Sequence, residues 1–305
     1  MLPGRFKAVK PAAVALHTTI DLLCDAPTTV VFTPDTTSEQ AFLPDPKTLK
    51  GSLLLADRGY VDLGYLRRVD THGGAFIIRA KAGMNPQVVE AFRADGTRLR
   101  SLRHQPLKAI HATLPQRQRV ALLVAWQVEQ HALRLRLLIS WNRQTQECCS
   151  LLTNLPATRS RLAMISRAYT WRWPVEFLLK AWKSYAKLHA FDTETAAIVE
   201  GLMWAAIAAA ALKRFLAHAT QLLAGVILST RKVAMCVTSV VGDMVQALQT
   251  AQGTALDDAL EDAITYLACH AQRAHPQRDR QTGRLQLGLE PFFGSNETAE
   301  IREAA

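Results

Sequence analysis

The hydrophobic pattern of the first third of the chain is typical of strands. Apolar and β-branched residues dominate residues 12–23 and 28–33, and an Asp-Ala-Pro turn separates the two segments. This pattern predicts a β-hairpin. A short apolar run over residues 53–56 is followed at once by Asp57, which predicts a buried strand that delivers an acid at its end.

Further along, the pattern changes from strands to helices. Residues 61–69 fit a helix and residues 74–80 a strand, and residues 120–140 fit two more strands with alternation at 132–138. The stretch from about 98 to 155 is therefore expected to be rich in β-structure. From residue 160 onward the pattern predicts helices. A basic polar segment and an acidic tail are expected to be loosely structured. The expected helical segments are 160–185, 193–219, 221–229, 235–250 and 255–270, and the loose segments are 273–284 and 297–305.

Composition excludes a disordered or fibrous protein, because 49% of the 305 residues are hydrophobic and only 20% are charged. The net charge of +10 favours a polyanionic partner. Much of the excess lies between Arg58 and Arg119, where twelve Lys and Arg face four acids, a net charge of +8. Such a stripe can contact the phosphates of a duplex, and a solvated surface is the alternative interpretation.

Several other classes of protein and site are not favoured by the sequence. The longest strictly apolar run, residues 201–212, has twelve residues, short of the roughly 20 that a membrane span needs, and residues 1–10 lack a secretory signal. We therefore expect a cytoplasmic protein with no membrane association. The five cysteines form no CxxC pair, the nine histidines form no HExxH motif, and no glycine-rich phosphate loop occurs. No nucleotide cofactor is implied.

Residues 169–185 carry the most informative chemistry. On a helix, Arg172, Glu176, Lys180 and Lys183 share the face of Tyr169, so one carboxylate lies among several cations and a phenol. A solvated helix with i,i+4 ion pairs would explain this pattern. The functional alternative is a carboxylate that holds a metal while the cations hold phosphates. Pro174 favours a regular helix that begins near that residue, with Tyr169 and Arg172 on the turn before it.

The spacing within this segment resembles a known family. Tyr169, Arg172, Glu176 and Lys183 are separated by two, three and six residues, which is similar to the YREK signature of bacterial DDE transposases of the insertion-sequence-four family. Trp173 and the run that contains Lys180 also resemble that family. Residues 53–60, LLLADRGY, resemble the block with the second catalytic Asp, and residues 151–155, LLTNL, resemble the end of the family's β-rich insertion.

This resemblance implies an α/β fold, with an RNase H-like catalytic core that is incomplete at its first strand, a β-rich insertion and C-terminal α-helices. The core would begin in residues 1–97 and the insertion would span 98–158. The core helix with the signature would span 159–190. A C-terminal helical region over 191–285 and a flexible tail over 286–305 would follow.

The resemblance also implies site residues, cofactors and partners. Asp57 and Glu176 would be catalytic and would bind metal, with two Mg²⁺ (or Mn²⁺) ions expected in an intact member. The implied partners are DNA at the terminal inverted repeats, target DNA and a second copy of the chain in a homodimer, with the protein associated with the nucleoid. The residues implied to bind DNA are Tyr169, Arg172, Trp173, Lys180 and Lys183.

One departure from the family concerns the first catalytic Asp. The family carries it on a strand before the one that residues 12–23 resemble, and residues 1–11 contain no Asp or Glu. Asp21 and Asp25 are nearest, and turn chemistry explains both. The expectation is therefore a truncated or split transposase that begins at an internal Met and has impaired activity. The alternative is a non-catalytic DNA-binding remnant that interferes with the intact enzyme.

Overall fold

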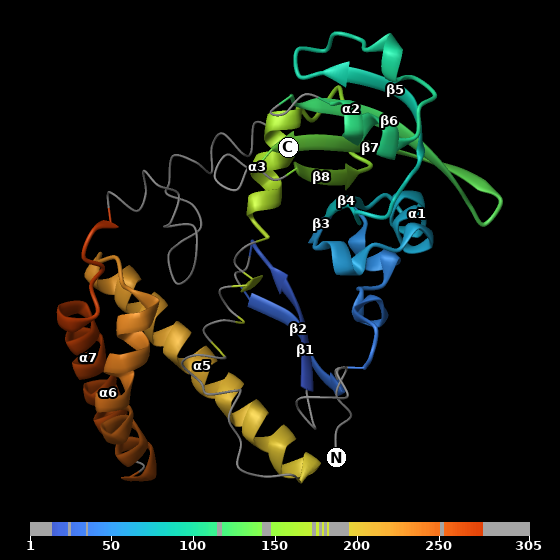
Figure 1. Ribbon diagram of the computed structural model, residues 1–305. Helices are drawn as coiled ribbons and strands as arrows, with labels where there is room; N and C mark the ends of the chain where they lie inside the picture. The colour runs from blue at the N-terminus through green and yellow to red at the C-terminus, as the bar shows by residue number, and fades with distance from the viewer. Residues whose placement is uncertain are drawn as a thin grey trace. The chain divides into compact units, whose positions relative to one another are not determined.

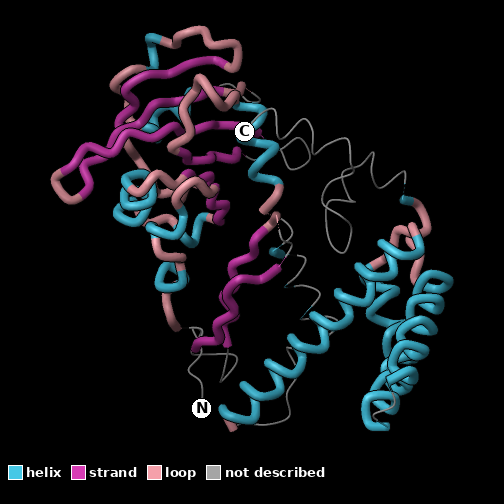
Figure 2. The backbone as a smooth tube through the Cα atoms, turned by 180° about the vertical axis from the view of Figure 1, so that it is seen from behind, coloured by secondary structure: helices cyan, strands magenta, loops and turns pink. Residues whose placement is uncertain are grey.

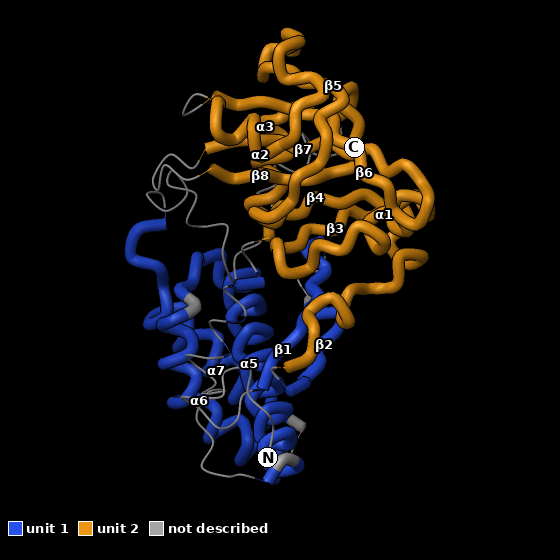
Figure 3. The backbone as a smooth tube through the Cα atoms, turned by 45° about the vertical axis from the view of Figure 1, so that its right-hand side comes forward, with its two compact units in different colours: residues 1–35, 173–305 blue, residues 36–172 orange. Residues whose placement is uncertain are grey.

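The computed structural model describes most of the chain, and it forms two compact units. One unit comprises Met1–Asp35 and Trp173–Ala305, and the other comprises Thr36–Arg172 (Figure 3). We call the first the helical unit and the second the sheet unit. The described residues are 14–23, 26–34, 36–114, 118–141, 148–172, 175–176, 179, 182, 195–250 and 253–276.

The sheet unit is built on a six-stranded mixed sheet with the order β3-β4-β8-β7-β6-β5 (Figures 1 and 2). The neighbours β3 and β4 are parallel, whereas all other neighbouring strands are antiparallel. Together with its helices, this sheet confirms the predicted mixed α/β class. The strands are β3 (Leu53–Ala56), β4 (Ala75–Arg79), β5 (Gln87–Arg93), β6 (Val120–Val128), β7 (His131–Trp141) and β8 (Cys148–Thr153).

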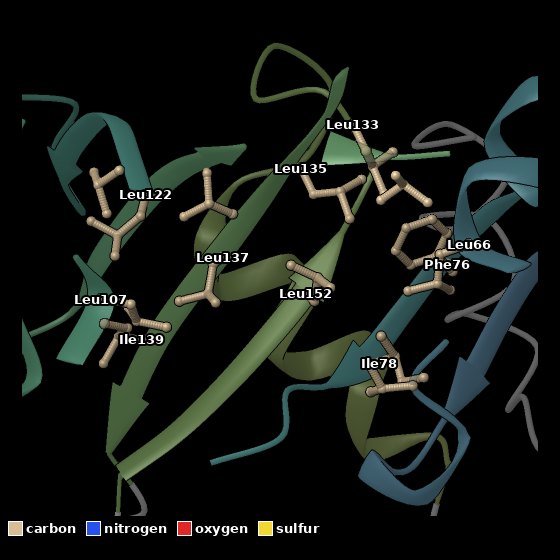
Figure 4. Close-up of a cluster of buried hydrophobic side chains, with 14 of the residues drawn as sticks. Leu66, Phe76, Ile78, Leu107, Leu122, Leu133, Leu135, Leu137, Ile139 and Leu152 are labelled. Carbon is tan, nitrogen blue, oxygen red and sulfur yellow. The ribbon is translucent and has the colours of Figure 1, made fainter. Parts of the chain in front are cut away.

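Helices cover both faces of this sheet. Because side chains alternate along a strand, Phe76 and Ile78 of β4 lie in one apolar cluster and Ile77 in the other. The larger cluster receives α1 (Leu63–Thr71) and α2 (Leu107–Thr113), and Figure 4 shows ten of its residues labelled. The smaller cluster receives α3 (Leu162–Thr170) through Leu162 and Ile165. The sheet unit therefore has three layers, and α3 is fixed against the sheet by buried side chains.

Asn154 ties three elements together at the amino-terminal end of β4. Its amide nitrogen donates to Asp70 Oδ1 at 2.8 Å and to the Gly74 carbonyl oxygen at 2.9 Å. Its Oδ1 accepts the Phe76 N–H at 3.0 Å. The segment LLTNL thus places directly after β8 a residue that satisfies partly buried backbone groups at the start of β4 and a carboxylate of α1.

The helical unit contains the predicted hairpin, β1 (Val14–Asp21) and β2 (Ala26–Pro34), which pair antiparallel as their own two-stranded sheet. Leu16, Ile20, Val30 and Phe32 of this hairpin pack with Trp182 and Ile207. A second core joins α5 (Ala196–Ala224), α6 (Thr230–Thr250) and α7 (Gly253–His270). The hairpin and the three helices therefore share one unit although the hairpin lies far from them in the sequence.

The helices differ in several places from the prediction. A break was expected near residue 220, but α5 continues to Ala224 and ends where Gly225 adopts φ 64°, a left-handed conformation that glycine favours at helix ends. One helix was expected from residue 160 to residue 185, but the first helix in this range, α3, already ends at Thr170. The helix α2 was not predicted, because it lies in a stretch whose pattern indicates strands.

Within the part of the chain that the structure describes, one helix is long and apolar enough to cross a membrane by length and composition, namely Arg231–Thr250 of α6. This is weak evidence, because the packing helix of a water-soluble protein meets the same criteria. Val233, Val237, Val240 and Met244 of this helix are buried in the core that it shares with α5 and α7. Packing within the helical unit therefore accounts for the face of α6 that carries these four residues.

Candidate functional site

The carboxyl-terminal end of β3 brings together side chains from four elements of the sheet unit. Asp57 follows directly after β3 and precedes a 3₁₀ turn over Arg58–Tyr60. Because β4 is parallel to β3, its last residue, Arg79, lies at the same end of the sheet. β8 runs antiparallel to β4 and begins there with Cys148 and Cys149. We call this region the Asp57 site.

Tyr169 connects the signature segment to Asp57. It lies in the last turn of α3, and its hydroxyl donates to Asp57 Oδ1 at 3.4 Å. The guanidinium carbon of Arg172 lies 5.4 Å from the centroid of the Tyr169 ring, which is cation–π distance. The phenol and the guanidinium of one segment therefore meet in one cluster with an acid that lies more than 100 residues earlier in the sequence.

Burial and charge both act on the Tyr169 phenol. Burial raises the pKa of Tyr169 to about 12, because it disfavours the charged phenolate. Arg172 lowers this pKa, and the negative charge of Asp57 raises it. The phenol is therefore neutral at physiological pH, so that it can serve as a hydrogen-bond donor to Asp57.

Cys149 is half-buried in the same cluster. Burial raises the pKa of its thiol, and the nearby charge of Arg79 lowers it. Asp57 raises the same pKa and Arg172 lowers it, so both lie close enough to act on this sulfur. The net shift is upward, which keeps the thiol protonated and unsuited to nucleophilic attack.

The predicted site residues fall into three groups. Asp57, Tyr169 and Arg172 lie together in the sheet unit. Glu176 belongs to the helical unit, where it is partly exposed and has helical backbone conformation. Trp173, Lys180 and Lys183 lie outside the described residues.

The backbone around the signature differs in one respect from the predicted turn. Tyr169 was expected on the turn before the helix of Glu176, but it is in the last turn of α3, and Trp171 and Arg172 form the turn that follows. Leu162 and Ile165 are buried against the sheet. This packing holds the first part of the segment in its own helix.

Arg79 is a residue of the site that the sequence analysis missed. Its place in the sequence carries a signal, because it is the last polar residue of the predicted strand over 74–80, one residue before the end of that strand, much as Asp57 directly follows the strand over 53–56. Parallel strands that are adjacent in a sheet deliver such residues to the same end. Only the pairing of β3 with β4 identifies the two strands as neighbours.

The Asp57 site offers one hard oxygen donor group of the kind that Mg²⁺ prefers. Among the residues that the structure describes, there is no group of three or more His, Cys, Asp or Glu side chains placed to hold a metal ion. A site for two ions needs more carboxylates than Asp57 alone. Within the described part of the sheet unit, the donor chemistry fits a divalent ion but the number of donors does not fit a pair of ions.

Comparison with known protein families identifies the domain. A family profile described as the transposase DDE domain matches residues 7–212, which is more than half of the chain and includes both Asp57 and Glu176. No curated protein matches the chain.

Proposed function

Because the chain belongs to the family of transposases with a DDE domain, we propose that it cuts and joins DNA at the ends of a transposable element of the insertion-sequence-four type. Enzymes with this domain act on DNA and generally use divalent metal ions. The assignment to the insertion-sequence-four type is supported by the YREK spacing of Tyr169, Arg172, Glu176 and Lys183.

The observation that carries this proposal is the contact between Tyr169 and Asp57. The two residues belong to different sequence motifs, and the fold brings the hydroxyl of one to 3.4 Å from the carboxylate of the other. A surface helix with i,i+4 ion pairs does not require such a contact. The contact thus favours the functional interpretation of the segment over the solvated helix.

The proposed roles follow the chemistry of each side chain. Asp57 and Glu176 are the proposed ligands for Mg²⁺ or Mn²⁺, and the bound ion would supply Lewis acidity to the scissile phosphate. Tyr169 holds the Asp57 carboxylate in place with its neutral phenol. The residues proposed to contact phosphates are Arg172, Trp173, Lys180, Lys183 and Tyr169.

The proposed partners are the terminal inverted repeats of the element and a target DNA, at the nucleoid in the cytoplasm. A homodimer is also proposed, on the strength of the resemblance alone. The division into core, insertion and signature helix stays a prediction.

A cleavage assay tests the proposal. The substrate is duplex DNA that carries the sequences flanking the reading frame of this chain, with Mg²⁺ or Mn²⁺ added. We expect metal-dependent cleavage that Glu176→Gln abolishes, whereas Asp258→Asn, which changes an exposed acid of α7, leaves the rate unchanged. Specific binding without cleavage by the unaltered chain would contradict the enzyme and favour the alternative, a non-catalytic DNA-binding remnant.

A further inference from the structure

The outer edge of β5 carries a second charged region of the sheet unit, at the opposite side of the sheet from β3 (Figure 1). Residues 97–106 return along this edge and form hydrogen bonds with β5. Leu99 N–H donates to the Ala91 carbonyl at 2.8 Å, and His104 N–H donates to the Val88 carbonyl at 2.7 Å. We call residues 97–106 the strap.

The apolar side chains of the strap pack against the core, whereas its basic side chains are exposed. Arg100–Leu102 form a 3₁₀ helix, in which side chains three residues apart eclipse each other. Leu99 and Leu102 pack against the core of the sheet unit. Arg100 and Arg103, with the same spacing, are both exposed.

The ion pairs of the strap distinguish Arg98 from the other two arginines. Arg98 lies 3.2 Å from Glu90 and over the ring of Phe92, so local contacts account for it. Among the described residues, no acid lies within ion-pair distance of Arg100 or Arg103. Arg100 and Arg103 are three residues apart on this short 3₁₀ helix and its cap, so they are neighbouring like charges that repel each other, and a polyanion would relieve this repulsion.

Further exposed cations extend this region along β5. Arg93 and Arg119 lie at one end, because Arg93 pairs with Val120, and Lys108 lies at the other end, where its N–H donates to Asn85. β5 has seven residues, so the row is about 20 Å long at roughly 3.3 Å per residue. A duplex presents about twelve phosphate charges over that length. We call the strap and these three cations the basic edge.

We propose that the basic edge is a second DNA-binding surface, which holds the phosphates of a duplex without reading its sequence. This inference rests on the proposed function, because it takes DNA as the partner. The basic edge is separated from β3 by five strand spacings, about 24 Å at roughly 4.8 Å each. It therefore adds affinity at a place apart from the Asp57 site and takes no part in the chemistry.

The test measures binding of a fluorescein-labelled duplex of 30 base pairs and random sequence, in EDTA, at several salt concentrations. In the double variant R100Q/R103Q we expect the slope of log K against log salt to fall by about 2, because each phosphate contact contributes roughly 0.9. The affinity at 0.1 M salt should fall about tenfold or more by the same relation. The variant R100K/R103K, which keeps both charges, should retain the wild-type slope.

The matched control is K47Q/K50Q, which removes two exposed charges just before β3, at the end of that strand away from Asp57. We expect its affinity to stay within about twofold of the wild type. An unchanged slope for R100Q/R103Q, or an equal loss in K47Q/K50Q, would overturn the basic edge as a binding surface. Circular dichroism confirms that the variants are folded.

The outcomes separate this inference from the proposed function. A wild-type chain that binds no duplex at any salt concentration contradicts both. A wild-type chain that binds and cuts DNA, together with an R100Q/R103Q variant whose slope is unchanged, contradicts only the basic edge.

Discussion

The two sides of the six-stranded sheet differ in how their charged groups are held. At the Asp57 site, Asp57, Arg79, Tyr169 and Arg172 are half-buried and of mixed charge. On the basic edge, Arg100 and Arg103 are exposed and of one sign. Burial shifts proton affinities and fixes geometry, whereas exposed like charges attract a polyanion over a distance. The first arrangement suits chemistry and the second suits binding.

The substitution Asp57→Asn should have the largest effect on this contrast. It removes a negative oxygen ligand at nearly constant shape, so we expect cleavage of the duplex to fall by about 10³-fold or more while duplex affinity in EDTA stays within threefold. R100Q/R103Q should show the reverse, with weaker binding and near-normal cleavage at saturating protein. If Asp57→Asn cut DNA at the wild-type rate, the Asp57 site would not be the place of the chemistry.

The substitution Leu137→Ala should destabilise the sheet unit as a whole, and with it both the Asp57 site and the basic edge. Leu137 is fully buried in the larger core and pairs with Leu122 and Leu152 in the sheet. We expect the free energy of unfolding of the sheet unit to fall by about 3 kcal/mol, measured by urea denaturation. Leu53→Ala, at a position that is 40% exposed, should cost less than about 1 kcal/mol. Equal losses would contradict the described core.

The substitution Asn154→Ala tests the junction at the amino-terminal end of β4. It leaves the Phe76 N–H and the Gly74 carbonyl without their side-chain partner. We expect a loss of about 2 kcal/mol in the free energy of unfolding. Asn85→Ala removes one exposed hydrogen bond, to Lys108 N–H, and should cost about 0.5 kcal/mol. A neutral Asn154→Ala would show that the three bonds contribute nothing net.

The smallest effect concerns the high pKa of Tyr169. A raised pKa means that the neutral phenol stabilises the folded state, and this contribution is present below pH 10 and is lost as the pH rises to about 12. Ultraviolet titration of Tyr169→Phe should lack one tyrosine that ionises near pH 12. Tyr65→Phe removes another tyrosine with a pKa raised to about 12, but its hydroxyl donates to the Pro44 carbonyl.

The two tyrosine variants should therefore differ in activity rather than in titration. We expect Tyr169→Phe to slow DNA cleavage several-fold, because Asp57 loses a donor, and Tyr65→Phe to leave the rate unchanged. A difference spectrum for Tyr169→Phe that ends near pH 10 would contradict the described burial of its ring.

The sequence predicted individual strands better than the contacts between elements. The hairpin and the strand over residues 53–56 were predicted because local β-branched and apolar runs determine them. The strap was not predicted, since its form depends on hydrogen bonds to β5 and on a core that Leu99 and Leu102 enter. The local pattern of the strap indicates neither its pairing with β5 nor its packing against the core.

The site was predicted in part for the same reason. Motif spacing identified Asp57, Tyr169 and Arg172, but only folding shows that the phenol meets the carboxylate. Arg79 was missed because a basic residue at the end of a strand gains meaning only when the neighbouring strand is known. The end of α5 was misplaced because Gly225, rather than the polar residues near 220, terminates the helix.

The strap has a further consequence for the behaviour of the protein in concentrated solution. Its backbone occupies hydrogen-bonding groups of β5, including those of Val88 and Ala91. An unpaired strand at the side of a sheet is a template for aggregation, and a covering segment that bears positive charge discourages a second copy from adding there. The residues that we propose to attract DNA thus also keep identical chains apart, so their removal should lower solubility as well as affinity.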